Sequence, residues 1–324
     1  MLRQILGIGG CLAALWLASN AVATETNDPM GELKGRFQGT EPPILMEYQL
    51  GYRFLNMELS RLGRIKVFAT TGRWRHRVSG VDMPAVLLDV LVDSTDRNKV
   101  REQNRVSIHD EIVAVLTLPD LKALVFAKRT DEYLHPLFAR RTVSEAVSFY
   151  DTQSGVLEYL HRNFSDGSVV TNLNRPDELL RLSRQIRPIM DYLVAQSLDA
   201  NPRASTNECS ISVNLDGQVV GLRLDTQKEK SPACFEGRRL DALRIETLPL
   251  ERRQARARDF YAWALTFDGL ADALDDDRLR NAAHSSMVQC VTPVVVDYEL
   301  AIGRIRASMV AVSVGTGTNA PAAP

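Results

Sequence analysis

The sequence has few of the residue groups that carry most catalytic and cofactor chemistry. Its five histidines stand apart from one another: His76, His109, His135, His161 and His284. Only His109 is followed by other ligand types, Asp110 and Glu111, and three consecutive residues of a strand do not point to one side. No cysteines form a C-x-x-C pair of the kind that binds zinc. We therefore expect neither a metal site nor a cofactor.

Several longer strings are also missing. The G-x-S-x-G string of a nucleophile elbow does not occur. The glycine-bearing stretch 315–318 precedes no helix that could present backbone amides to a phosphate. Strands and helices do not alternate as in a dinucleotide-binding domain, and a formal charge of only −1 gives no overall field for nucleic acid. These absences argue against a serine hydrolase, a nucleotide-binding enzyme and a nucleic-acid-binding protein.

The amino terminus, by contrast, has the three parts of a secretory signal peptide. Arg3 supplies the positive charge, residues 5–17 are apolar, and Ala21-Val22-Ala23 is a small-x-small cleavage site. The apolar stretch is short for a membrane span, and the polar residues after it do not form a stop-transfer flank. We expect cleavage near Ala23, no transmembrane anchor in the mature chain, and a periplasmic or extracellular location.

Cleavage would remove Cys11 and leave three cysteines in an oxidising compartment. An odd number allows at most one internal disulfide. Cys209 and Cys234 are the nearer pair in the sequence and are the candidate disulfide, which would leave Cys290 with a thiol. The alternative is that all three are small, buried apolar side chains.

Period-two alternation of apolar and polar residues predicts strands over most of residues 45–172. Met46, Tyr48 and Leu50 would share one face of the first strand. Residues 209–215 and 218–224 flank Asp216-Gly217, which favours a type I′ hairpin turn. Further strands are expected near 106–117, 121–127, 147–151, 156–163, 168–171, 291–298 and 303–314.

Two segments have helical spacing. The first extends from Pro176 to Val194, and the second covers 259–274 with Trp263 and Phe267 on an apolar, core-facing stripe. Strands at both ends of the chain, with helices between them, predict a mainly β (α+β) protein. We expect a curved antiparallel sheet or barrel-like sheet system with two packed helices.

The expected boundaries follow from these segments. A signal peptide at 1–23 precedes a flexible lead-in at 24–43, and a disordered tail covers 315–324. The β-rich domain at 44–314 is expected to be single or to consist of two halves divided near 175–200.

Short fragments of the chain also resemble a family of exported bacterial proteins known as domain of unknown function 3108. They are residues 47–52 (EYQLGY), 147–151 (VSFYD), 209–217 (CSISVNLDG), 293–296 (PVVV) and 302–307 (IGRIRA). The sequence departs from the family pattern after the first strand, where it carries Asn56 and Glu58. The resemblance implies an exported, β-rich envelope protein with a curved sheet, and it assigns no catalytic residue.

A basic sheet face is the most informative constellation. If 61–69 and 72–80 pair as a hairpin, Lys66 lies opposite Arg75 and Arg64 opposite Arg77, with Arg73 on the same side beside Phe68. Directly opposed like charges cost roughly up to 1 kcal/mol per pair, so either neighbouring acids such as Glu47 or Glu58 or an anionic ligand must compensate. The candidate anion-binding residues are Arg64, Lys66, Arg73, Arg75 and Arg77.

Three functions fit these features. The preferred one is a non-enzymatic envelope module whose apolar concave side holds a lipid-like or anionic ligand or an envelope partner. The alternative is an envelope polysaccharide or lipid hydrolase, because paired carboxylates need to meet only in the folded protein. The third is a structural partner within a larger envelope assembly. No catalytic residue is predicted.

Overall fold

The computed structural model describes residues 29–54, 57–76, 80–94, 107–118, 123–134, 138–151, 156–174, 207–215, 218–249, 260–283, 291–299 and 304–315. They belong to two compact units, residues 1–35 and residues 36–324. The first unit contributes helix α2 (Pro29–Gly35). The predicted signal peptide, almost all of the predicted tail and the predicted helix from Pro176 to Val194 lie outside the described residues.

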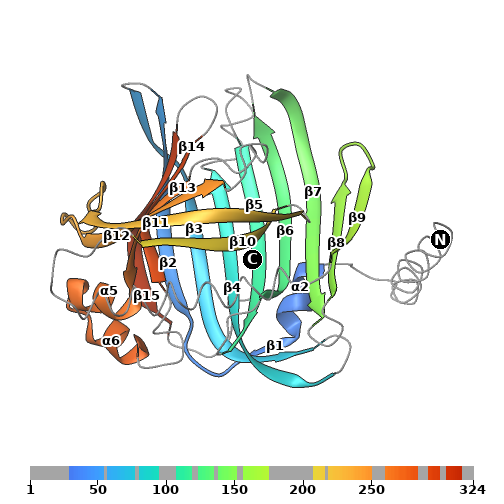
Figure 1. Cartoon of the computed structure of the whole chain (residues 1–324), viewed down its shortest axis with the longest axis horizontal. Coiled ribbons are helices and arrows are strands. Elements are labelled where there is room, and N and C mark those ends of the chain that lie inside the picture. Colours follow the sequence, from blue (N-terminus) through green and yellow to red (C-terminus); the bar gives the residue numbers. More distant parts are fainter. Residues whose placement is uncertain are drawn as a thin grey trace. The chain divides into compact units, whose positions relative to one another are not determined.

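In the part of the chain that the structure describes, the second unit is built around one antiparallel sheet of 15 strands (Figure 1). Its strand order is β10-β11-β12-β13-β14-β15-β2-β3-β4-β5-β6-β7-β8-β9, and β1 pairs with β3 beside this path. The strands are β1 (Phe37–Gly39), β2 (Ile44–Phe54), β3 (Met57–Arg75), β4 (Asp82–Ser94), β5 (Ser107–Thr117), β6 (Ala123–Leu134), β7 (Phe138–Asp151), β8 (Val156–Asn163), β9 (Val169–Asn174), β10 (Asn207–Leu215), β11 (Gln218–Lys230), β12 (Asp241–Pro249), β13 (Phe260–Thr266), β14 (Val291–Glu299) and β15 (Arg304–Val314).

The predicted fold class is confirmed, because antiparallel strands dominate the described chain and the helices are few and short. The sheet is curved but does not close, since its path ends at β9 and β10. The alternation that predicted the first strands places Tyr48 opposite Ile65 and Met46 opposite Val67. The predicted hairpin around Asp216-Gly217 is also confirmed, with Leu215 opposite Gln218.

The predicted hairpin of 61–69 with 72–80 is wrong. Residues 57–75 form one uninterrupted strand, β3, which passes through Thr70 and Thr71 without a turn. β3 pairs with β2 through its first two thirds and with β4 along most of its length. Both parts of β3 therefore pair with neighbouring strands. Two threonines make a poor two-residue turn, and the chain makes no turn there.

Two further expectations need correction. The lead-in at 24–43 contains α2 and the short strand β1. The segment 259–274 is a helix only from Phe267: its first part is β13, followed by α5 (Phe267–Leu274) and then α6 (Asp277–Ala283). Residues 260–264 pair on both sides, with β12 and β14, and 265–266 pair with β14. A short apolar run has no periodicity that distinguishes a buried strand from a helix, so the two neighbouring strands decide its conformation.

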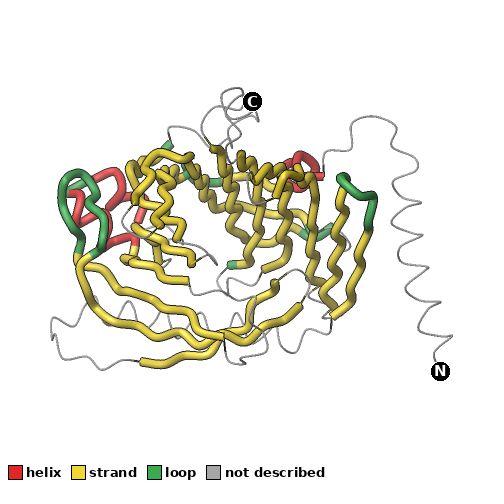
Figure 2. The backbone as a smooth tube through the Cα atoms, turned by 90° about the horizontal axis from the view of Figure 1, so that it is seen from above, coloured by secondary structure: helices red, strands yellow, loops and turns green. Residues whose placement is uncertain are grey.

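The curvature gives the sheet an inner and an outer face. Figure 1 shows β10 and β11 running across β2 to β6, and Figure 2 shows that β10 to β12 lie to one side of the row formed by the other strands. We define the inner face of β2 to β8 as the one turned toward β10 to β12. Because directly paired residues share a face, the strand registers assign each side chain to one face or the other.

Helices α5 and α6 cover one end of the inner face. Phe267 and Ala271 of α5 and Leu279 of α6 form a buried cluster with three residues of β2 to β4: Ile44, Ala69 and Val86. The backbone N–H groups of Arg278 and Leu279 donate to Asp276, which caps α6. No helix in the described part of the chain is long and apolar enough to cross a membrane.

Candidate functional site

The inner face changes in character from β2 toward β8. On β2 to β4 it is apolar and belongs to the core, with Tyr48, Leu50, Ile65, Val67 and Val92 in one cluster. The Tyr48 hydroxyl donates to the carbonyl oxygen of Pro293 over 2.7 Å, and burial raises the pKa of that phenol. This part of the face is closed packing, and only further along β3 does the same face carry exposed polar groups, on Arg73 and Arg75.

Further along, the inner face holds apolar side chains that the packing leaves partly open. Val90 lies opposite Ile112 and Leu88 opposite Ala114, all on the inner face. Phe126 lies opposite Ala114 on β6, in the interior of the sheet, yet it is 41% exposed. A phenyl ring in mid-sheet would normally be covered, because its burial is favourable by about 1.5–3 kcal/mol. The described residues thus leave an apolar strip across β4 to β6.

Polar groups border this strip on β5 to β8. Lys128 lies two residues beyond Phe126 on the same face, and its Nζ lies 2.9 Å from Oδ2 of Asp110. The Asp110 side chain is 9% exposed, and its other oxygen, Oδ1, is buried without a hydrogen-bond partner. Lys128 is 35% exposed. The pair therefore combines an acceptor that lacks a donor with an ammonium group that solvent can reach.

One row across the strands contains Lys128 (β6), Ala146 (β7) and His161 (β8), each directly opposite the next. The imidazole of His161 stacks on Tyr159, with ring centroids 6.5 Å apart. Because neighbouring strands lie about 4.8 Å apart, the backbones that carry Lys128 and His161 are about 10 Å apart. The methyl group of Ala146 occupies little of that interval. Two nitrogen-bearing side chains thus flank a small residue at the edge of the apolar strip.

The outer face has a different organisation, because acidic side chains face basic or imidazole side chains across neighbouring strands. His109 Nδ1 lies 2.9 Å from Asp93, and Arg129 lies 3.6 Å from Glu111 and 3.7 Å from Glu145. The register places all of these residues on the outer face. Arranged as opposite pairs, these groups stabilise the pairing of their strands by a few tenths of a kcal/mol or more each.

The predicted anion-binding residues do not form one patch. Arg64 and Lys66 lie on the outer face, whereas Arg73 and Arg75, an odd number of residues further along β3, lie on the opposite side and are exposed. Arg77 lies outside the described residues. Lys66 Nζ is 3.9 Å from Glu47. Of the two ways to compensate the basic charges, a neighbouring acid or an anionic ligand, Lys66 has the neighbouring acid.

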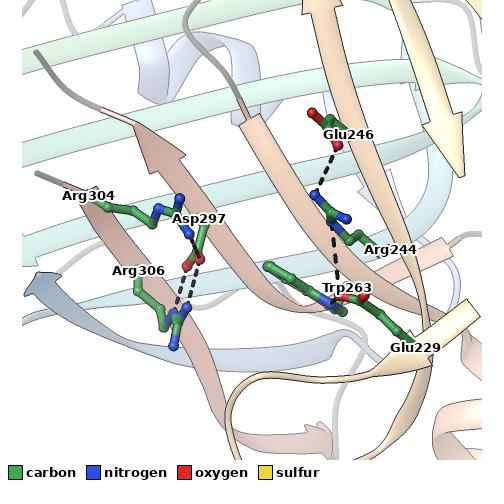
Figure 3. A network of polar contacts seen from close by, with 7 residues as sticks. All are labelled: Glu229, Arg244, Glu246, Trp263, Asp297, Arg304 and Arg306. Atoms are coloured by element: carbon green, nitrogen blue, oxygen red, sulfur yellow. Dashed lines mark hydrogen bonds and ion pairs between the residues drawn. The ribbon is translucent and has the colours of Figure 1, made fainter. Parts of the chain in front are cut away.

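A second polar network joins β11 to β15 (Figure 3). Asp297, which is fully buried, accepts two bonds of 2.7 Å from Arg306 and one of 3.1 Å from Arg304. The Arg304 guanidinium also lies over the ring of Tyr261, and Arg244 lies over the same ring, at 5.4 and 5.1 Å from its centroid.

Two acids, Glu229 and Glu246, pair with Arg244 in the same network, and the Trp263 indole N–H donates to Glu229. Its three acids and three arginines balance. We therefore assign it to the joining of strands and not to ligand binding.

The structure does not bring the two candidate disulfide cysteines together. Cys209 lies opposite Leu224 on β11, whereas Cys234 is exposed and free in the loop after the end of β11. Leu224 and Lys230 are six residues apart on one strand, about 20 Å, and a disulfide needs Cα atoms within about 7 Å. Within the described ranges, no three histidine, cysteine or acidic residues are grouped as they would be around a metal ion.

Comparison with known proteins finds a likeness among solved structures but none among family models or curated sequences. Among solved structures, the chain is similar to a β-barrel-like protein of domain of unknown function DUF1849 from Brucella abortus. The identity is 7% and the TM-score 0.42, with 85% of this chain and 99% of that chain covered. The resemblance to domain of unknown function 3108 stays a prediction.

Sequence reasoning did not single out Phe126, Lys128 or His161. Alternation on β6 does place Phe126 and Lys128 on one face and Arg129 on the other. What the sequence does not contain is the identity of the neighbouring strands, which brings His161 of β8 into the same row.

Proposed function

We propose that the protein is an exported cell-envelope binding module, without catalytic activity of its own, that holds a lipid-like ligand against the inner face of its sheet. The signal peptide predicted at 1–23 supports export, and the curved sheet supports a binding surface on its inner side. The β-rich architecture itself is observed, in the antiparallel sheet of the described residues. The ligand, the envelope location and any partner protein are part of the proposal.

The observation that carries the proposal is the open apolar strip around Phe126. Partly exposed apolar side chains in the interior of a sheet lose the stabilisation that burial would give, and a ligand hydrocarbon chain would restore it at about 25 cal/mol per Å² covered. Val90, Ile112 and Ala114 line the same strip. A binding surface of this kind is mostly apolar with a few polar groups at its border.

The proposal is tested by native mass spectrometry of the full chain, expressed with its signal and purified without detergent. We expect a bound mass that organic solvent extracts, and we expect Phe126→Asp to lose it. Phe164→Asp is the matched control, because Phe164 is also exposed, at 59%, but lies in the turn between β8 and β9. A wild-type chain that is empty in every preparation contradicts the proposal, as does equal loss of the bound mass in the two variants.

The hydrolase alternative requires two carboxylates in one cleft. In the described rows of β5 to β8, the register places two acids on the inner face, Asp110 and Glu132, and Asp110 is paired with Lys128. Glu111 and Glu145 of the outer face flank Arg129. Nothing in this arrangement favours hydrolysis over binding.

A further inference from the structure

We infer that Lys128 and His161 receive the head group of the ligand, and that this head group is an acidic oxyanion such as a phosphate or a carboxylate. The inference rests on the proposed function, which concerns only the apolar part of the ligand. It adds the charge of the ligand and its direction on the sheet.

The row Lys128, Ala146 and His161 supplies the geometry. Both outer members carry nitrogen atoms that can donate to an oxyanion, and the residue between them is small. A phosphate or carboxylate group over Ala146 would therefore lie between two donors. The Lys128 ammonium group lies 2.9 Å from Asp110 of β5 and is 35% exposed, so it would turn on its flexible side chain from β5 toward β7 to meet such a group. Charge-assisted bonds of this kind are about twice as strong as neutral ones.

The neighbouring row fixes the direction of the ligand. Phe126 and Lys128 are two residues apart on one strand and share a face, so the apolar strip begins directly beside the ammonium group. The strip continues through Ala114 and Ile112 toward β4, away from His161. The hydrocarbon chain would thus extend over β6 to β4, and the head group would lie over β7 between β6 and β8.

Asp110 sets the selectivity of the site. Its Oδ2 already engages Lys128 at 2.9 Å, so an incoming anion competes with an internal carboxylate for the same ammonium group. Its Oδ1 is buried without a hydrogen-bond partner, which costs free energy in the ligand-free protein. Removing the charge of Asp110 should therefore strengthen anion binding, whereas removing the charge of Lys128 should weaken it.

The test measures the binding of three probes by isothermal titration calorimetry on the full chain after solvent extraction of any bound lipid. The probes are decyl phosphate, 1-decanol and inorganic phosphate, each below the concentration at which it aggregates. We expect decyl phosphate to bind at least about tenfold more tightly than decanol, the ratio that one good charge interaction gives. Inorganic phosphate should bind far more weakly than decyl phosphate.

Three variants locate the site. Lys128→Gln should bring the affinities for decyl phosphate and decanol to within about twofold of each other without changing that for decanol. Asp110→Asn should raise the affinity for the two phosphates and leave that for decanol unchanged. Lys66→Gln is the control, because Lys66 is an exposed lysine of the outer face whose ion pair with Glu47 is long, at 3.9 Å. It should leave all three affinities unchanged.

Each failure has its own meaning. If neither amphiphile binds, the proposed function fails together with the inference. If both bind equally well to the wild type, the apolar strip binds ligands but the head-group inference is wrong. If inorganic phosphate binds as tightly as decyl phosphate, the ligand is a free anion and not an amphiphile. If Lys66→Gln and not Lys128→Gln removes the preference, the anion site lies on the outer face.

Discussion

Charged residues in this sheet differ widely in how much their ion pairs stabilise the fold, because they differ in burial. Asp297 has no exposure and accepts three hydrogen bonds from Arg304 and Arg306. Asp131 accepts bonds of 2.6 and 2.7 Å from Arg141, which are at least as short. Those groups, however, are exposed to 28% and 55%, so water competes for both. The Arg141 pKa is raised by its bonds to Asp131, but solvent screening keeps the gain in stability small.

This contrast gives a prediction at the residue scale. Asp297→Asn should lower the free energy of unfolding by about 3 kcal/mol, because it leaves two arginines without their buried counter-charge. Asp131→Asn should cost at most about 1 kcal/mol. Urea denaturation followed by circular dichroism measures both. Equal effects of the two substitutions would show that burial does not govern the strength of these pairs.

At the scale of the element, β1 depends on a glycine of β3. Gly72 lies opposite Gly39, and a Cβ atom on residue 72 would lie 2.1 Å from the carbonyl oxygen of Gln38. The backbones of β1 and β3 approach so closely there that no side chain fits between them. The N–H of Thr40 donates to Thr71 and the N–H of Arg75 to Arg36, both over 3.0 Å, on either side of this contact.

We therefore predict that Gly72→Ala detaches β1 from the sheet. The amide hydrogens of Thr40 and Arg75 should exchange faster with solvent, and the protein should be destabilised by about 1–3 kcal/mol, the usual cost of overpacking. Gly35→Ala is the control, because nothing lies within 4 Å of a Cβ atom at residue 35. Unchanged exchange at both amides in Gly72→Ala would mean that β1 adapts to the added methyl group.

The elements also show what the sequence can and cannot predict. Alternation identified β2, β5, β14 and β15, and the Asp-Gly turn identified the β10–β11 hairpin, because these signals are local. The failures at 61–80 and 259–274 have a common cause. In both, the conformation depends on neighbouring strands: β4 and β1 pair with β3 past Thr71, and β12 and β14 hold Trp263 in a strand. The row of Lys128 and His161 could not be predicted for the same reason, because it depends on which strands are neighbours.

At the scale of the whole molecule, one pairing joins the two halves of the sheet. Strands β2 to β9 come from the first half of the chain and β10 to β15 from the second, and the halves meet where β15 pairs with β2. Ten residue pairs form this seam, from Arg304 opposite Arg53 to Val314 opposite Ile44. The last strand of the described chain must therefore dock beside one of the first. A fold so rich in distant contacts is expected to form slowly.

The seam decides whether the halves unfold together or separately, and two tryptophans report on them. Trp74 of β3 is 2% exposed and Trp263 of β13 is 6% exposed, so each will change its emission when its half unfolds. Trp16 lies in the predicted signal peptide and would be removed with it. Since β13 and β3 belong to one continuous sheet with a shared core cluster across β2, β14 and β15, we predict a single cooperative transition.

The measurement compares probes within each variant, since Trp263→Phe also removes the hydrogen bond to Glu229 and shifts the absolute stability. In Trp74→Phe and in Trp263→Phe, the urea midpoint from tryptophan emission should coincide with the midpoint from far-ultraviolet circular dichroism. A fluorescence midpoint that precedes the circular dichroism midpoint in one variant and follows it in the other would divide the sheet at the β2–β15 seam. The inner face around Phe126 would then belong to the first half alone, and ligand binding should survive the unfolding of the second.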